Sequence, residues 1–185
     1  CLLLYFGVFV LHYVLMGFFL VVPLLLEQAD ILRADHSWVY LGVMLSSFVV
    51  MVPLMIVSEK MGIVKQSLLA TIALLTAAII AMLWLYHLAW GLIACLVAFF
   101  IAFNYLEANL PSLLSKILPQ ANKGAGSGLF ATCQFLGAAL GGIVGGGLYQ
   151  QLGLTAILLS VILLLSVWFF VAIGMTIPAR AKHVR

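Results

Sequence analysis

Long apolar stretches follow one another through almost the whole chain, and they constrain its fold more than any other feature of the sequence. A transmembrane helix needs about 20 apolar residues, because each residue adds roughly 1.5 Å along the helix axis and the hydrocarbon layer is about 30 Å thick. Six stretches meet this requirement, and they cover residues 3–26, 38–57, 66–86, 88–106, 124–148 and 154–177. The sequence therefore predicts an all-α, polytopic membrane protein with six transmembrane helices.

The composition excludes a soluble globular domain. Charged residues make up 7% of the 185 residues and apolar residues 66%, whereas about a quarter of the residues in a typical soluble domain are charged. Three cysteines (Cys1, Cys95 and Cys133) are far apart and give neither a disulfide framework nor paired metal-ligand spacing. We expect no metal and no cofactor. An apolar stretch begins directly after Cys1, so we expect the chain to be a piece of a longer one.

The basic residues predict how the chain is oriented in the membrane. Arg33 alone falls on one side of the predicted bundle, and the seven others fall on the opposite side: Lys60, Lys65, Lys116, Lys123, Arg180, Lys182 and Arg185. Because basic residues are retained on the cytoplasmic side, we expect both chain ends in the cytoplasm of a bacterium whose inner membrane holds the protein. The net charge of +3 then reflects contact with lipid head groups and requires no nucleic acid.

The fifth apolar stretch contains nine of the sixteen glycines. Gly137, Gly141 and Gly145 recur every four residues and form a groove along one helix face, where another backbone can approach closely. Static packing is one interpretation of this groove, and a surface that slides against a partner helix is the other. Gly124 and Gly128 lie where the helix starts, and free N–H groups at this positive end of the helix dipole could receive an acidic side chain.

Polar side chains within the apolar stretches are candidates for a substrate or proton pathway, because they are costly in lipid unless they are paired or face water. His12 and Gln134 lie about 14–15 Å into the first and fifth stretches. Ser46 and its neighbour Ser47 reach a similar depth in the second stretch. The sequence allows these groups to line one cavity. For His12 and Gln134, a structural hydrogen bond between helices remains an open interpretation.

Glu107 directly follows the fourth stretch, and its depth decides its interpretation. Counted from residue 88, it lies near the cytoplasmic boundary, where Lys116 or Lys123 could pair with it. We expect a structural or gating ion pair. A proton-carrying carboxylate is the alternative, and it would require burial of the side chain.

Residues 123–128 (Lys-Gly-Ala-Gly-Ser-Gly) share features with two catalytic motifs but complete neither. A phosphate-binding loop needs Lys-Ser or Lys-Thr after its last glycine. An intramembrane serine protease needs a histidine in a later span, whereas the only later histidine in the sequence is His183 in the tail. We therefore expect that the protein is not an enzyme.

The predicted topology resembles the C-terminal half of a major facilitator superfamily transporter. The shared features are six spans with both ends inside, a short basic connector after the second span and a glycine-rich fifth span. Local strings are similar to the YajR branch of drug-efflux transporters within that superfamily: Phe103-Asn104 with Glu107-Ala108, Leu110-Pro111-Ser112-Leu113, Lys123-Gly124, and Gln134-Phe135-Leu136-Gly137. The fold implied is one half-bundle of a major facilitator fold, and the resemblance covers essentially the whole chain.

The connector after the second span also resembles a family motif. In Ser58-Glu59-Lys60-Met61-Gly62, the residues Glu59, Lys60 and Gly62 resemble a degenerate second copy of the superfamily's Asp-Arg-Xaa-Gly loop. Ile63 departs from the usual basic residue.

The resemblance further implies that the first, second, fourth and fifth helices border a central cavity and that the third and sixth face lipid. The candidate residues for a substrate or proton pathway all fall on the four cavity helices: His12, Ser46, Asn104, Glu107 and Gln134. It also implies that an aspartate of an N-terminal half meets the start of the fifth helix, at Gly124 to Gly128.

The expected function is therefore proton-coupled efflux of small amphipathic compounds by alternating access. The expected partners are the lipid bilayer, the substrate, protons and an N-terminal half-bundle. The residues alone leave one alternative open, which is a complete six-helix scaffold or channel subunit that dimerises through the glycine groove of the fifth span.

Overall fold

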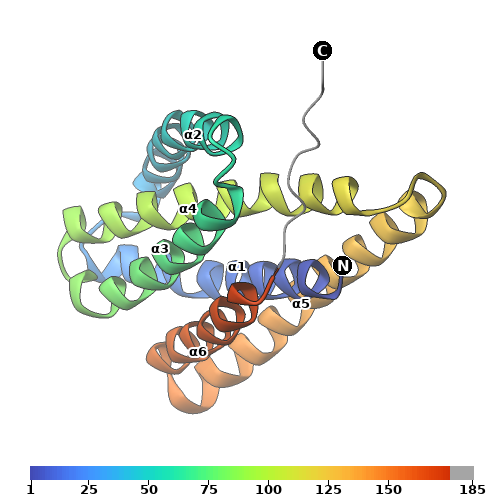
Figure 1. Cartoon of the computed structure of the whole chain (residues 1–185). Helices are drawn as coiled ribbons and strands as arrows, with labels where there is room; N and C mark the ends of the chain where they lie inside the picture. Colours follow the sequence, from blue (N-terminus) through green and yellow to red (C-terminus); the bar gives the residue numbers. More distant parts are fainter. Residues whose placement is uncertain (176–185) are drawn as a thin grey trace.

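The computed structural model describes residues 1–175, which form six long helices joined by short connectors (Figure 1). Short 3-10 turns at Arg33–Asp35 and Gln120–Asn122 precede the second and fifth helices. The helices are α1 (Leu2–Gln28), α2 (His36–Lys60), α3 (Val64–Leu85), α4 (Ala89–Ile117), α5 (Lys123–Leu152) and α6 (Leu154–Ile173).

All six helices are long and apolar enough to cross a membrane, and residues 1–175 contain no strand. The predicted all-α membrane class is thus confirmed. The predicted end of the sixth span at residue 177 lies outside the described residues, as do Arg180, Lys182 and Arg185 of the predicted basic side.

Helix α4 is longer than the sequence predicts. It continues past Leu106 and through Pro111 to Ile117, whereas the predicted fourth stretch ends at residue 106. A proline removes one backbone hydrogen bond, and membrane helices tolerate this loss when neighbouring groups compensate. Pro23 and Pro53 lie inside α1 and α2 in the same way. Glu107 consequently lies within α4 and not at its end.

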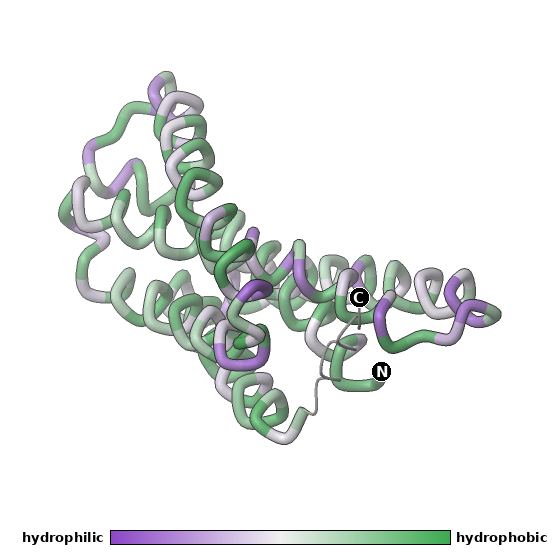
Figure 2. Tube along the Cα trace, turned by 45° about the horizontal axis from the view of Figure 1, so that its top comes forward, coloured by the Kyte–Doolittle hydropathy of each residue, from purple (hydrophilic) through white to green (hydrophobic). Residues whose placement is uncertain are grey.

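One end of the bundle is basic. Lys60 ends α2 and Lys123 begins α5. Lys116 near the end of α4 pairs with Glu59 at 2.8 Å, and Lys65 near the start of α3 donates a hydrogen bond to the carbonyl of Ile173 in α6. Hydrophilic residues gather at helix ends and connectors in Figure 2, while the helices between them are mostly hydrophobic. We call the end that carries these four lysines the basic end.

The opposite end is rich in exposed tryptophan. Trp38 near the start of α2, Trp84 near the end of α3 and Trp90 near the start of α4 are all largely exposed. Tryptophan is enriched where membrane helices meet the lipid–water interface. Trp168, by contrast, is buried in the core. We call the end that carries Trp38, Trp84 and Trp90 the aromatic end, and it matches a membrane–water interface.

Helix α1 lies at the centre of the bundle and packs most extensively against α5 (Figure 1). The glycine groove of α5 makes this contact possible. A Cβ atom added to Gly137 would collide with the carbonyl of Phe9, and one added to Gly141 would lie 2.5 Å from the carbonyl oxygen of Tyr13. The groove is therefore filled by α1 of the same chain. This removes the surface that the scaffold alternative required for dimerisation.

Helices α2 and α5 are the least buried of the six within residues 1–175. They lie on opposite sides of α1 and α4 (Figure 1). Large apolar side chains remain exposed on both helices, and they include Leu45, Val49, Phe135 and Ile143. The helices predicted to face lipid, α3 and α6, contact each other and are more buried than α2 and α5.

Candidate functional site

A buried histidine in α1 contacts polar side chains from two other helices. The Nε2 atom of His12 lies 2.8 Å from Nε2 of Gln134 in α5 and 3.7 Å from Oε2 of Glu107 in α4. Its other ring nitrogen, Nδ1, lies 3.0 Å from the carbonyl oxygen of Val8 in the preceding turn. We call His12, Glu107 and Gln134 the histidine cluster. The cluster joins three helices that are far apart in the sequence.

The hydrogen bonds of His12 fit one tautomer of the neutral imidazole. The carbonyl of Val8 can only accept a hydrogen bond, so Nδ1 carries the hydrogen. The amide nitrogen of Gln134 can only donate, so Nε2 of His12 accepts. This arrangement corresponds to a neutral imidazole with its hydrogen on Nδ1. Protonation would place a second hydrogen on Nε2, which would oppose the Gln134 amide nitrogen and favour the carboxylate of Glu107.

All three members of the histidine cluster lie at a similar distance from the basic end. At roughly 1.5 Å per residue, His12 is about 15 Å from the start of α1, Gln134 about 16 Å from the start of α5, and Glu107 about 15 Å from the end of α4. This distance is half the thickness of the hydrocarbon layer, about 30 Å. Glu107 therefore reaches mid-membrane depth because α4 continues to Ile117.

The histidine cluster has a closed side and an open side. On the closed side, the rings of His12 and Phe103 meet edge to face with centroids 6.1 Å apart. Phe103 is stacked with Phe99, which is stacked in turn with Phe18 of α1. On the open side, 38% of the Glu107 side chain remains exposed although His12 is buried. An ionisable pair in this position can exchange protons with a space that lies outside the described bundle.

A second set of polar contacts holds α2 against α4. The amide of Asn104 donates to the hydroxyl of Ser47 at 3.1 Å, and the buried hydroxyl of Tyr105 donates to that of Ser58 at 2.9 Å. The pair of Glu59 and Lys116 completes the set at the basic end. Asn104 therefore contacts α2, and no hydrogen bond joins it to the histidine cluster within the described residues. The role of Tyr105 could not be predicted from the sequence, because its position within an apolar run gives no signal of its partner.

The structure separates Ser46 from Ser47. Ser46 is exposed, and its hydroxyl donates to the carbonyl of Gly42 in its own helix. Ser47 is fully buried against α4. Neighbouring helix positions differ in direction by about 100°, so only one of two adjacent serines can face a given helix.

The expected ion pair of Glu107 with Lys116 or Lys123 was wrong for Lys116, which pairs with Glu59. In place of a lysine, His12 lies beside Glu107. This partner could not be predicted from the sequence, because the predicted fourth stretch ends at Leu106. That end places Glu107 at the membrane boundary, whereas α4 continues to Ile117.

The remaining predicted positions lie at the basic end. Gly124 and Gly128 are exposed at the start of α5, with no atom within 4 Å of an added Cβ, so they take no part in packing inside the bundle. Gly62 has φ +69 between α2 and α3, a conformation that favours glycine. Within residues 1–175, no three His, Cys, Asp or Glu side chains gather as metal ligands would.

A bundle of six apolar helices with an ionisable cluster at mid-depth defines an integral membrane protein with an internal polar site. The chain belongs to the Major Facilitator Superfamily, whose family model matches residues 4–184. It is 36% identical over 180 residues to the inner membrane transport protein YajR of Escherichia coli strain K12. The matched residues make up 97% of this chain and 40% of that protein.

Two transporters of unassigned function in Buchnera aphidicola are also similar. One, from the subspecies Baizongia pistaciae, is 29% identical over 169 residues, which is 90% of this chain and 43% of that protein. The other, from the subspecies Acyrthosiphon pisum, is 34% identical over 137 residues, which is 74% of this chain and 35% of that protein. The chain thus spans about two fifths of the length of the curated relatives it matches.

Proposed function

We propose that this chain forms the C-terminal half-bundle of a proton-coupled transporter that exports small amphipathic compounds by alternating access. The observation that carries the proposal is the histidine cluster, in which an imidazole at mid-membrane depth contacts a carboxylate and an amide from two other helices. Ionisable groups at this depth are costly unless they serve a pathway or pair with one another. Similarity to an inner membrane transport protein supports the same function.

In this proposal, protonation of His12 changes the helix to which α1 is hydrogen-bonded. The neutral imidazole accepts a hydrogen bond from Gln134 and ties α1 to α5. The protonated imidazole donates to Glu107 instead and ties α1 to α4. These two arrangements form a two-state element whose populations a proton gradient can shift, because the proton binds one arrangement more tightly than the other.

An N-terminal half-bundle would cover the exposed apolar faces of α2 and α5. Both faces carry large apolar side chains that the described helices leave uncovered. The exposed start of α5, at Gly124 and Gly128, would receive an acidic side chain of that half. The substrate cavity would lie between the halves, where the exposed part of Glu107 faces it.

We also propose that the basic end faces the bacterial cytoplasm, because the four lysines of the described chain lie there. A thiol reagent that does not cross membranes should label a cysteine placed at His87, near the aromatic end, in intact cells of a strain that carries the full-length protein. A cysteine placed at Lys65, near the basic end, should react only after the cells are opened. The reverse pattern would contradict this orientation.

Proton coupling can be tested in proteoliposomes that contain the full-length gene product and hold an imposed pH gradient. We expect the gradient to accelerate efflux of a lipophilic cation dye, and Glu107→Gln to lower this acceleration about tenfold or more, because the amide cannot be ionised. The matched control is Asp35→Asn, which neutralises an exposed carboxylate in the connector before α2. Equal acceleration in the wild type and the Glu107→Gln variant would remove this cluster from the coupling mechanism.

A further inference from the structure

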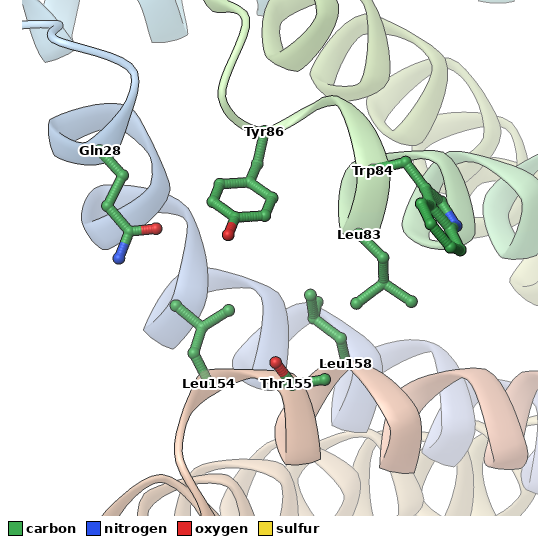
Figure 3. A pocket seen from close by; sticks show the side chains of 7 residues that line it. All are labelled: Gln28, Leu83, Trp84, Tyr86, Leu154, Thr155 and Leu158. Atoms are coloured by element: carbon green, nitrogen blue, oxygen red, sulfur yellow. The ribbon is translucent and has the colours of Figure 1, made fainter.

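A cavity of about 390 Å³ lies at the aromatic end, away from the histidine cluster. The end of α1 contributes Gln28, the end of α3 contributes Leu83 and Tyr86, and the start of α6 contributes Leu154, Thr155 and Leu158 (Figure 3). Cavities that bind small ligands measure about 300–1,000 Å³. This cavity is therefore large enough to hold part of a ligand, and the proposed proton pathway does not use it.

The lining of the cavity combines an apolar wall with uncharged polar groups. Leu83, Leu154 and Leu158 supply the apolar part. The amide of Gln28 and the hydroxyls of Tyr86 and Thr155 make no side-chain hydrogen bond within the described part of the chain. Figure 3 shows the ends of Gln28 and Tyr86 directed toward the same space above Leu154 and Thr155. These groups can donate several hydrogen bonds to one oxygen-rich ligand.

A smaller hollow of about 280 Å³ adjoins the cavity and shares Gln28 and Leu154 with it. Glu27 lines this hollow and brings a carboxylate beside the uncharged donors. The guanidinium of Arg33 pairs with Oε1 of Glu27. The uncharged donors of the cavity therefore lie beside the Glu27 carboxylate, and the neighbouring cation, Arg33, is already paired with that carboxylate.

The location of the cavity indicates where its ligand comes from. The exposed side chain of Trp84, which belongs to the cavity lining, marks the depth of the lipid head groups. Two of the three helices around the cavity, α3 and α6, leave large apolar side chains such as Ile80 and Leu159 exposed, as helices in contact with lipid do. A ligand at this place would arrive from the membrane and not from the proposed central cavity.

We propose that this cavity binds a phospholipid with a primary ammonium head group, such as phosphatidylethanolamine. Its phosphate oxygens would accept hydrogen bonds from Gln28, Tyr86 and Thr155, and its ammonium group would donate to Glu27. A choline head group has no N–H donor for this carboxylate. An anionic glycerol head group likewise has no ammonium group to donate to the second oxygen of Glu27, whose Oε1 pairs with Arg33.

Lipid retention measured by native mass spectrometry tests the proposal. The full-length protein would be placed in nanodiscs of equal parts phosphatidylethanolamine, phosphatidylcholine and phosphatidylglycerol, and then released into detergent. We expect phosphatidylethanolamine to be retained about tenfold more than either other lipid. A difference of this size corresponds to roughly 1.4 kcal/mol.

Three variants locate the bound lipid. Thr155→Trp fills the cavity from an exposed position, and Gln28→Leu removes the amide donor, so both should lower the retention of phosphatidylethanolamine to the level of phosphatidylcholine. Leu159→Trp is the matched control, because Leu159 is exposed one turn further along α6 and does not line the cavity. Equal retention of all three lipids by the wild type would overturn the proposal. Unchanged preference in Thr155→Trp would also overturn it.

Discussion

Replacing Gly141 by valine is expected to destabilise the packing of α5 against α1 strongly. A Cβ atom at this position would lie 2.5 Å from the carbonyl oxygen and 2.8 Å from the Cα atom of Tyr13 in α1. Both atoms belong to a helix backbone, so neither can move without separating α1 from α5. Overpacking of a core usually costs about 1–3 kcal/mol, and we expect a loss at or above the upper end of this range.

The neighbouring Gly142 provides the control for this prediction. No atom lies within 4 Å of a Cβ built on Gly142, so Gly142→Val adds the same side chain to the same helix without a collision. Thermal unfolding in detergent, followed by loss of monodisperse protein, measures both variants. Equal melting temperatures for the two variants would show that α1 and α5 are not packed as described.

Replacing His12 by glutamine is expected to abolish most of the gradient-driven flux while leaving the protein folded. The amide oxygen of the new side chain can accept a hydrogen bond from Gln134, as Nε2 of His12 does. It cannot take up a proton in the physiological pH range. The substitution therefore separates the proton-carrying interpretation of His12 from the structural one. We expect the acceleration by the pH gradient to fall about tenfold or more, which is roughly 1.4 kcal/mol.

Two comparisons make the His12 prediction decisive. His87→Gln changes an exposed histidine in the connector after α3 and should leave the flux unchanged. The double variant with His12→Gln and Glu107→Gln should be no worse than either single variant, because residues that act as one unit have non-additive effects. Full flux in His12→Gln would leave His12 with the structural role alone.

The six helices could be predicted because each is an uninterrupted apolar run, and length and hydropathy are properties of the local sequence. The end of the fourth helix could not be predicted, because residues 111–117 begin with a proline and include the polar residues Ser112, Ser115 and Lys116. These residues are typical of a connector in isolation. Packing against α2, including the pair of Lys116 and Glu59, keeps this segment helical.

The candidate site could be predicted in part. Depth along each helix follows from residue numbers, which is why His12 and Gln134 were expected to reach one level. Direction around each helix depends on tertiary packing, so the sequence did not distinguish Ser46 from Ser47. The partner of Glu107 also depends on which helices are neighbours.

Pro111 gives α4 a hinge at the level of its carboxylate. Proline has no N–H group, so the carbonyl of Glu107, four residues earlier, lacks its helical hydrogen bond. The segment before this point stacks on α1 through Phe99 and donates a hydrogen bond to Ser58 of α2 through Tyr105, while the segment after it pairs with Glu59 of α2 through Lys116. Bending at the hinge would therefore pull these two contacts with adjacent residues of α2 apart. A change of protonation at Glu107 acts on the turn of α4 that resists bending least.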